Sequence, residues 1–128
     1  MSVRTSIYID GFRHRNPVPN AARIGSLVMT GVILGTDPHT NQPAPDEDGQ
    51  MALMFQHVRS IVEAAGGNLD DILKFTVWLK NPRDRTTLNK HWIEMFPDPL
   101  TRPARHVQPL LGMPEEYLAG CDFLAVLE

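Results

Sequence analysis

The length, composition and charge of the chain limit the classes of protein to which it can belong. It has 128 residues, enough for one domain that buries about two thirds of its unfolded surface in a single core. Its 42% hydrophobic and 21% charged residues are typical of a globular protein and exclude a disordered or fibrous chain. The formal net charge of −3 argues against nucleic acid as the main partner, because no basic face is available for a phosphate backbone.

The cysteine content and the N-terminus bear on the compartment. The single cysteine, Cys121, cannot form an internal disulfide, so no oxidising compartment is indicated. The first ten residues lack the apolar core of a signal peptide, and no apolar run reaches the length of a membrane span. We therefore expect a cytoplasmic protein with no membrane partner, folded as a single domain over residues 1–128.

The N-terminal part of the chain is predicted to be extended and rich in turns. Alternating polar and β-branched residues predict a short strand at Arg4–Asp10, and an irregular segment dense in Gly, Pro and Asn follows it. An extended apolar pattern resumes around Ser26–Val32, broken by Gly25 and Gly31. Residues 35–49 have no apolar period and are predicted to form an exposed loop that includes the acidic residues 46–48.

The apolar period then becomes that of a helix. Apolar residues between Gln50 and Ala65 recur at three- and four-residue steps, and the glycine pair at 66–67 ends this helix. After an intervening strand, a second helix is predicted at about Arg83–Phe96. Its inner stripe is expected to contain Leu88, Trp92, Ile93 and Phe96.

Three strands are predicted in the second half of the chain. They lie at Asp70–Lys80, near Arg105–Pro109 and near Leu118–Leu127. In the first of them, strand alternation divides the side chains between two faces. One face should carry Ile72, Lys74, Thr76 and Trp78, and the other Leu73, Phe75, Val77 and Leu79.

The resulting order, β-β-α-β-α-β-β, predicts a β-sheet with both helices packed on one face. The other face would remain uncovered and would expose apolar side chains such as Val77 or Trp78. We expect oligomerisation to cover that face.

The sequence lacks the common motifs for phosphate binding, nucleophilic catalysis and metal binding. The segment GVILG has glycines but lacks the Lys-Ser/Thr partner of a phosphate loop, and no G-x-S-x-G elbow occurs. The five histidines share no ligand spacing, and one cysteine cannot complete a zinc site, so no metal is expected. Cys121 lies in mid-strand among apolar neighbours, which predicts an inert buried thiol.

Arg105 is the exception, because it lies in the segment LTRPARHVQPL within a predicted strand. Alternation places Arg105 and Val107 on one face and His106 and Gln108 on the other. Pro103 stiffens the approach to the strand, so the guanidinium would present a fixed fork of donors that matches a carboxylate. An intramolecular salt bridge to a loop acid explains the residue equally well from the pattern alone.

Four segments together resemble a known family. NPVPNAARIGSLVMTG, VRSIVEAAGGNLDDILKFTVWLK, LNKHWIEMF and RPARHV, in this order and spacing, are similar to the RidA/YjgF reactive-intermediate deaminases, formerly called the L-PSP endoribonuclease group. The likeness covers about Ile7 to Leu127. It implies a chorismate-mutase-like α+β fold, with a mixed β-sheet and two helices packed on one face, that assembles as a homotrimer with clefts between subunits. It also implies hydrolysis of enamines and imines, such as 2-aminoacrylate, to 2-keto acids and ammonia, without a metal or organic cofactor.

The resemblance assigns roles to several residues. Arg105 matches the family arginine that grips the substrate carboxylate, and Asn89 matches an asparagine near the cleft. Gly31, preceded by Thr30, falls in the segment whose backbone lines the pocket. The candidate substrate-binding residues are Arg105, Asn89, Thr30, Gly31, Val18, Gly120 and Cys121.

The chain departs from the family pattern at two of these positions. Val18 replaces a tyrosine that closes over small substrates. Gly120 occupies the position of a glutamate thought to help a water deliver a proton. Asp122, on the same strand face as Gly120, matches a second glutamate, so Asp122 joins Arg105 as a candidate catalytic residue; Glu116 is the other acid that could act through a water.

We therefore expect an enamine or imine deaminase that acts on a small-molecule carboxylate substrate. The departures favour a substrate other than 2-aminoacrylate, and 2-aminomuconate is one candidate. The alternative from another class is a non-catalytic protein that binds a keto acid through Arg105. RNA cleavage, recorded for relatives, has little support from the charge balance.

Overall fold

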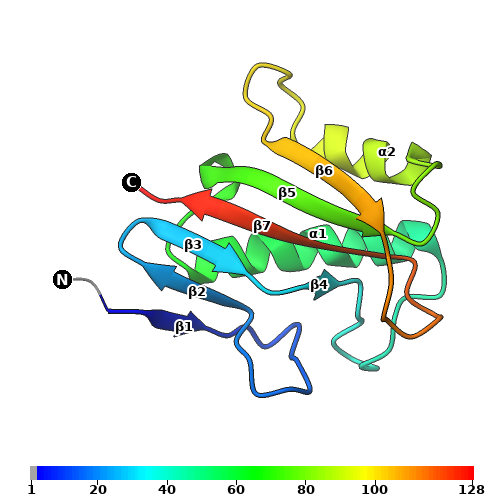
Figure 1. Cartoon of the computed structure of the whole chain (residues 1–128), viewed down its shortest axis with the longest axis horizontal. Coiled ribbons are helices and arrows are strands. Elements are labelled where there is room, and N and C mark those ends of the chain that lie inside the picture. The colour runs from blue at the N-terminus through cyan, green and yellow to red at the C-terminus, as the bar shows by residue number, and fades with distance from the viewer. Residues whose placement is uncertain (1–2) are drawn as a thin grey trace.

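The computed structural model describes residues 3–128 (Figure 1). The elements follow in the order β1 (Thr5–Ile7), β2 (Ala21–Ile24), β3 (Leu27–Thr30), β4 (Ile33–Leu34), α1 (Glu47–Ala64), a 3-10 helix (Leu69–Asp71), β5 (Ile72–Leu79), α2 (Thr86–Met95), β6 (Ala104–Pro109) and β7 (Ala119–Val126). Within this part of the chain, no helix has the length and apolar character needed to cross a membrane.

The strands form one sheet in the order β1-β2-β3-β7-β5-β6, and the short β4 also pairs with β7. The pair β5–β6 is parallel and is joined through α2, whereas the other pairs are antiparallel. Parallel neighbours need such a crossover, because a short turn cannot bring the chain back in the same direction. The prediction of an α+β fold with a mixed sheet and two helices is confirmed.

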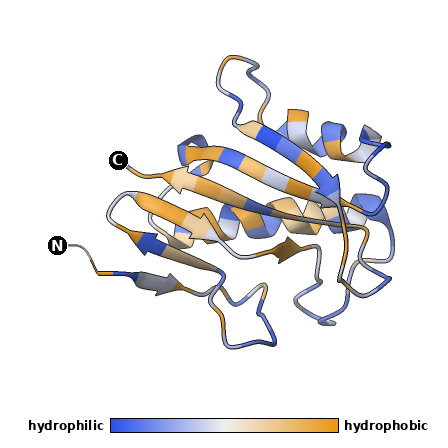
Figure 2. Cartoon of the chain, in the orientation of Figure 1, coloured by the Kyte–Doolittle hydropathy of each residue, from blue (hydrophilic) through white to orange (hydrophobic). Residues whose placement is uncertain are grey.

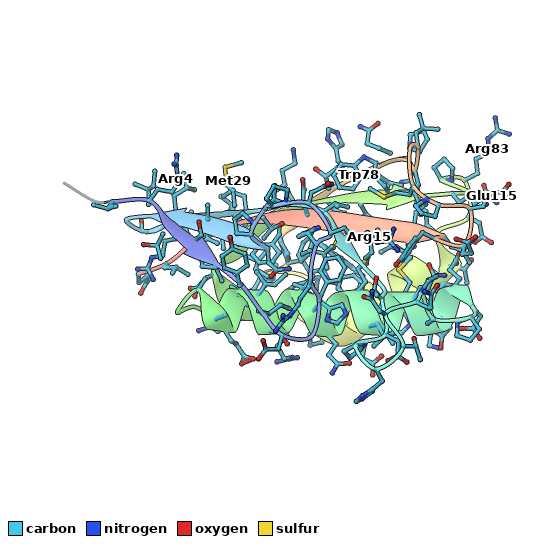
Figure 3. The ribbon with its side chains drawn as sticks, turned by 90° about the horizontal axis from the view of Figure 1, so that it is seen from below. Arg4, Arg15, Met29, Trp78, Arg83 and Glu115 are labelled. Carbon is cyan, nitrogen blue, oxygen red and sulfur yellow. The ribbon has the colours of Figure 1, made fainter. Side chains whose placement is uncertain are left out.

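The core lies between the sheet and the two helices, which cover the same face (Figure 1). Seen edge-on in Figure 3, α1 lies along one side of the sheet, and the opposite side carries no helix. The fully buried side chains of α1 pack against those of β5 and β7, among them Met51, Met54, Val58, Phe75 and Val77. Burial of each such side chain contributes about 1.5–3 kcal/mol.

The uncovered face is apolar in part. Met29 on β3 is 56% exposed and pairs with Leu124 on β7, while Leu27 pairs with Val126 in the next row on that face. Figure 3 shows Met29 and Trp78 directed away from α1, and Figure 2 shows that β3 and β7 are largely apolar. The expectation of an uncovered face with apolar side chains is confirmed for Trp78. It is wrong for Val77, which is fully buried on the helix side.

The extended segment expected around Ser26–Val32 contains β3, and the breaks expected at Gly25 and Gly31 lie just outside this strand. β2 and β3 form a hairpin whose turn contains Gly25 with φ 57°, a left-handed conformation that glycine adopts without strain. The chain leaves β3 at Thr30 and resumes as β4 at Ile33. The sequence prediction therefore missed two short strands: β2, which begins in the segment expected to be irregular, and β4.

The predicted alternation in β5 is correct for part of the strand only. Phe75, Val77 and Leu79 share one face, as predicted, and all three are buried. Ile72 is also buried and Leu73 is 60% exposed, which reverses the predicted faces of these two residues. The register against β7 shifts between Ile72 and Lys74, and such a bulge resets the alternation.

Helix α1 begins earlier than predicted. The carboxylate of Asp46 accepts a hydrogen bond from the backbone N–H of Gly49 at 2.7 Å, which makes Asp46 the N-cap residue. Glu47 and Asp48, expected in a loop, therefore lie in the first helical turn, where negative charge is favourable.

Helix α2 buries a narrower stripe than predicted. Leu88 and Trp92 are buried, as is Phe96 directly after the helix, at a spacing of four residues. Ile93 is 53% exposed, so its placement in the inner stripe is wrong. It follows Trp92 directly, about 100° further around the helix, and so faces away from the sheet.

Candidate functional site

Arg105 lies on β6, at the edge of the sheet, and its side chain faces the helices. Its register partner on β5 is Phe75, which is fully buried on that side, and Val107 pairs with the buried Val77. His106 and Gln108 are exposed on the other face. The alternation predicted for this strand is therefore confirmed.

Two side chains of α2 hold the Arg105 guanidinium. Its Nη2 donates to Oδ1 of Asn89 at 2.9 Å, and its central carbon lies 5.0 Å from the centroid of the Trp92 ring. Asn89 and Trp92 are three residues apart and so lie on one face of the helix. The hydrogen bond and the cation–π contact together fix the guanidinium between β6 and α2.

No acid of the described chain neutralises this guanidinium. The ion pairs within residues 3–128 join Asp10 to Arg13 and Asp48 to Lys90 and His91, and none includes Arg105. The alternative of an intramolecular salt bridge is therefore wrong for the described residues. In addition, Nη1 of Arg105 is buried without a hydrogen-bond partner. Because an unsatisfied buried donor costs about 1–3 kcal/mol, an external acceptor at this nitrogen would be stabilised.

The electrostatic setting of Arg105 also favours an anion. Burial, and next the neighbouring charge of Arg85, lower the pKa of the Arg105 guanidinium. Arginine remains protonated in proteins, so the group carries an unbalanced positive charge. An anionic ligand would relieve both effects, since it pairs with the buried charge and offsets the repulsion.

An aromatic cluster supports the site from below. Trp92 packs against Phe75 and Phe96 with ring centroids 5.3 and 4.9 Å apart, and Phe75 also contacts Phe123 at 5.9 Å. These rings come from α2, β5, β7 and the residue after α2. The anchor of Arg105 thus rests on a cluster of buried aromatic rings.

Thr30 and Gly31 occupy a different place, at the end of β3. Oγ1 of Thr30 accepts from the backbone N–H of Phe123 at 3.1 Å and donates to the carbonyl of Gly31 at 2.8 Å. A Cβ built on Gly31 would meet only Nε2 of His14 at 3.8 Å and the carbonyl of Pro19 at 3.9 Å, so there is room beside this glycine.

His14 is a residue that the sequence patterns did not single out. Its Nε2 is buried without a hydrogen-bond partner, and its ring packs edge-on against Phe12 at 5.0 Å. Burial lowers the pKa of the imidazole, which favours the neutral form. Val18, in the same loop, is 47% exposed. His14 lies beside Gly31 because of the course of this irregular loop. A loop without regular secondary structure has no apolar period, so the sequence could not predict this contact.

Thr30 and Arg105 are too far apart in one chain to contact the same small ligand. Thr30 is bonded to Phe123 on β7, Phe123 pairs with Phe75 on β5, and Phe75 pairs with Arg105 on β6. These three steps across the sheet amount to about 14 Å. The predicted pocket residues of β3 and β6 therefore belong to separate surfaces of the chain.

Asp122 and Gly120 lie on a third surface, the uncovered face of the sheet. Asp122 pairs with Thr76 and Gly120 with Trp78. Burial raises the pKa of Asp122, and hydrogen bonds from Thr76 together with the charge of Lys74 oppose that rise. A Cβ on Gly120 would lie 3.0 Å from Cδ2 of Leu34, so Leu34 occupies much of the space beside this glycine.

Cys121 points the opposite way from its neighbours on β7 and is fully buried in the core. Burial, and next the charge of Asp122, raise the pKa of the thiol well above its usual range. Its sulfur therefore presents no surface to a ligand in this chain. Among residues 3–128, moreover, no three His, Cys, Asp or Glu side chains lie close enough to hold a metal ion.

The fold and the arginine site define a class: an α+β domain with an arginine on an edge strand that has no acid partner within residues 3–128. The chain belongs to the endoribonuclease L-PSP family, whose model matches residues 13–126, and the resemblance to the RidA/YjgF proteins is confirmed. It is 32% identical over 111 residues to the 2-iminobutanoate/2-iminopropanoate deaminase of Salmonella typhimurium, covering 86% of this chain and 87% of the relative.

Two solved structures are similar in fold. RidA from an Antarctic Psychrobacter species superposes with a TM-score of 0.87 at 26% identity, covering 96% of this chain and 99% of the other. The YjgF gene product of E. coli superposes with a TM-score of 0.86 at 25% identity, covering 97% and 99%. The element order and sheet described above are thus those of RidA-type proteins.

Proposed function

We propose that the protein is a deaminase that hydrolyses a carboxylate-bearing imine or enamine to a 2-keto acid and ammonia. The observation that carries this proposal is the fixed Arg105 guanidinium, which has a buried free donor and no acid partner within residues 3–128. The printed activity of the Salmonella relative, an imine deaminase, supports the same reaction. We place this activity in the cytoplasm, as expected from the sequence.

In this proposal, Arg105 and Asn89 orient the substrate. The guanidinium pairs with the carboxylate, and the imine carbon, bonded to that carboxylate, is then held a few ångströms away. Water adds to the C=N carbon, ammonia leaves with the protons that it needs, and the keto acid remains. An enamine must first be protonated at carbon. General acid–base assistance contributes about 10²–10⁴-fold, so positioning by Arg105 alone would leave a slower but measurable reaction.

We further propose that the site is completed by a second copy of the chain in a homotrimer with clefts between subunits. Two observations support this assembly: the uncovered apolar face, and the separation of about 14 Å between Thr30 and Arg105 within one chain. In the assembled cleft, Thr30 and Gly31 of one copy, with Val18 nearby, would face Arg105 and Asn89 of another. Asp122 and Glu116 are the acids that could relay a proton through water there.

The substrate is proposed to differ from 2-aminoacrylate. Val18 is smaller than the tyrosine expected at its position and lies exposed in its loop, which leaves more room over the ligand. A larger substrate of the 2-aminomuconate type would use that room.

A second candidate function is a non-catalytic carboxylate-binding protein. The specific observation in its favour is Gly120, where a proton-relaying glutamate is expected and where Leu34 fills the adjacent space. Such a protein would keep the Arg105 anchor but accelerate no hydrolysis.

A coupled assay distinguishes the two functions. An amino-acid oxidase generates imines of 2-keto acids, and semicarbazide traps whatever imine the protein has not hydrolysed. We expect wild type to clear imines faster than buffer and Arg105→Ala to lose about 10- to 150-fold, the equivalent of about 1.5–3 kcal/mol for charge-assisted contacts. Arg83→Ala, which removes another exposed arginine, is the matched control. If wild type does not exceed buffer but binds a keto acid in calorimetry through Arg105, the binding function replaces the enzymatic one.

A further inference from the structure

Two buried side-chain atoms lack a hydrogen-bond partner in the part of the chain that the structure describes, residues 3–128. They are Nη1 of Arg105 and Nε2 of His14. An unsatisfied buried polar atom costs stability, and a ligand-binding or catalytic role is one reason for a protein to keep one. The proposed function gives such a role to Arg105 and none to His14.

Nε2 of His14 lies beside Gly31, which is an exposed residue. A Cβ built on Gly31 would be 3.8 Å from this nitrogen and 3.9 Å from the carbonyl oxygen of Pro19. Apart from residues 30–32 themselves, no other heavy atom of the described chain lies within 4 Å of that point. Because glycine has no side chain, a ligand that packs on Gly31 comes close to the imidazole.

The imidazole is held in place although its loop is irregular. The ring packs edge-on against Phe12 at 5.0 Å, and Phe12 stacks on His57 of α1 at 5.3 Å. The buried Asn20 fixes the loop, because its Nδ2 donates to the carbonyl of Phe12 at 2.8 Å and its Oδ1 accepts from the backbone N–H of Ile9 at 2.9 Å. His14 therefore has the fixed orientation that a proton-transferring group needs.

The environment of His14 favours a neutral imidazole. Burial lowers its pKa, so near pH 7 the ring is uncharged and can accept a proton. When its hydrogen is on Nδ1, the free lone pair is at Nε2, on the side of Gly31. The neighbouring charges in the loop, Arg13 and Arg15, are exposed, and the other titratable group, His57, lies across the Phe12 ring.

The acids considered for proton transfer are less well placed beside Gly31. Gly120 stands where a glutamate is expected. Asp122 pairs with Thr76 on the uncovered face of the sheet, and Glu116 is exposed in the loop before β7. Neither acid has a buried carboxylate oxygen that lacks a partner within residues 3–128.

We propose that His14 is the catalytic residue that transfers protons in the deamination, in the cleft that Gly31 lines. This inference rests on the proposed deaminase function and adds the group that moves the protons. Water adds to the C=N carbon while Nε2 takes one of its protons, and the imidazolium returns that proton to the substrate nitrogen. The hydroxyl proton then reaches the nitrogen by the same route as the C–N bond breaks. Ammonia and the keto acid leave, and His14 is neutral again.

The first test is His14→Gln in the semicarbazide assay, because glutamine keeps a polar side chain but does not titrate. We expect kcat to fall at least about 100-fold, within the range of about 10²–10⁴-fold for general acid–base assistance, while KM changes less than about threefold. Keto acid binding, which depends on Arg105, should be unchanged in calorimetry. His39→Gln removes an exposed imidazole from another loop and should keep the wild-type kcat.

A pH profile separates proton transfer from a structural role. Because burial lowers the pKa of His14 below its ordinary value of 6.5, wild-type kcat should be level near pH 7. It should fall about tenfold per unit of pH below the pKa of this imidazole, which ¹⁵N NMR measures in the same protein. His14→Gln should lack this acid limb although His57 still titrates. Free imidazole should restore part of the lost kcat to His14→Ala and add nothing to wild type.

Failure of this inference is distinguishable from failure of the proposed function. If wild type clears imines and a folded His14→Gln is equally fast or keeps the acid limb, the role of His14 is wrong and the deaminase remains. If His14→Gln does not fold, the wild-type comparison decides, because a kinetic pKa that differs from the NMR value overturns the assignment. If wild type clears no imine, the deaminase proposal fails, and the proton-transfer role fails with it.

Discussion

Arg105 and Asp122 project from opposite faces of the same sheet. Arg105 pairs with Phe75, which is buried beneath the helices, whereas Asp122 pairs with Thr76, one residue further along β5 and on the uncovered side. The sheet itself therefore separates the cation and the carboxylate that the sequence suggested as catalytic partners. Within one chain they cannot act on the same small substrate, so any joint role requires a neighbouring copy.

The hydrogen bond between Asn89 and Arg105 provides a direct test of the anion site. Asn89→Asp keeps the shape of the side chain but places a carboxylate against Nη2 of Arg105, which is 2.9 Å away in the native protein. The resulting ion pair would compete with a ligand, because charge-assisted bonds are about twice as strong as neutral ones. We expect at least tenfold weaker binding of a keto acid in calorimetry, with unchanged or higher stability. Asn89→Ala, which adds no charge, should weaken binding less; equal binding by Asn89→Asp and wild type would contradict the site.

The uncovered face gives a test of the proposed assembly. Met29→Glu adds a charge to an exposed position on β3, so the isolated chain should fold normally, while an interface formed by this face should be lost. We expect wild type to sediment as a trimer and Met29→Glu as a monomer with reduced activity. Leu100→Glu, at an exposed position outside the strands, is the control and should remain trimeric. A monomeric wild type at micromolar concentration would refute the assembly.

Substitutions of Gly35 and Gly31 by alanine should differ in their effect on stability, because the space beside the two glycines differs. A Cβ on Gly35 would lie 2.2 Å from the backbone carbonyl oxygen of Gln50, so Gly35→Ala forces the backbone apart and should destabilise the fold by about 1–3 kcal/mol or more. A Cβ on Gly31 meets no atom closer than 3.8 Å, so Gly31→Ala should change the free energy of unfolding by less than about 1 kcal/mol. Urea denaturation measures both values. If Gly31 lines the cleft as proposed, Gly31→Ala should nevertheless lower kcat/KM.

The burial of His57 predicts that the stability of the fold depends on pH. It is buried on α1, its Nε2–H donates to the carbonyl of Thr36 at 2.8 Å, and its ring stacks on Phe12 at 5.3 Å. Burial lowers the pKa of His57 below its ordinary value of 6.5, and the bond to Thr36 opposes part of that shift. The unfolded chain therefore binds this proton more readily than the folded one. The stabilisation is complete above about pH 6.5 and is lost as the pH falls through the folded pKa.

His57→Gln is the matching variant, because an amide can still donate to Thr36 but does not titrate. Unfolding in urea at a series of pH values below 7 should show a shallower loss of stability in the variant than in wild type. His14, whose pKa is also lowered by burial, remains in both proteins, so the difference between the two profiles isolates His57. Parallel profiles would contradict the assignment.

The aromatic cluster beneath Arg105 predicts a coupled loss of stability and binding. Phe75→Ala removes a fully buried ring that contacts Trp92, Phe96 and Phe123, and we expect a cost of about 3–5 kcal/mol in the free energy of unfolding. Phe75→Leu should cost less, because it retains most of the apolar volume. The remaining folded protein should bind a keto acid more weakly in Phe75→Ala than in Phe75→Leu, since Trp92 loses its support.

The sequence predicted the fold correctly where a single local pattern, such as an apolar period, determines the structure. Both helices were located by their apolar period, and the face of Arg105 followed from simple alternation along β6. The prediction failed where a local irregularity interrupts the alternation of side chains along a strand. The bulge between Ile72 and Lys74 reversed the faces of two residues of β5.

The sequence suggested single residues for the candidate site but not how they are arranged. Asn89 and Arg105 are sixteen residues apart, and the parallel β5–α2–β6 unit brings them into contact. The pairing of Asp122 with Thr76, which places it on the other face, depends on sheet register and cannot be obtained from β7 alone. His14 was missed because its position depends on an irregular loop whose path no periodicity describes.

The position of Val18 has a consequence for how ligand choice can change. Arg105, the proposed carboxylate anchor, is supported by the aromatic cluster, where substitutions are costly, while Val18 lies half-exposed in a loop outside the strands. Substitutions in that loop would change which ligands bind and would have little effect on the stability of the fold. For protein engineering, the segment around Val18 is therefore where a library should be built, leaving β6 and α2 untouched.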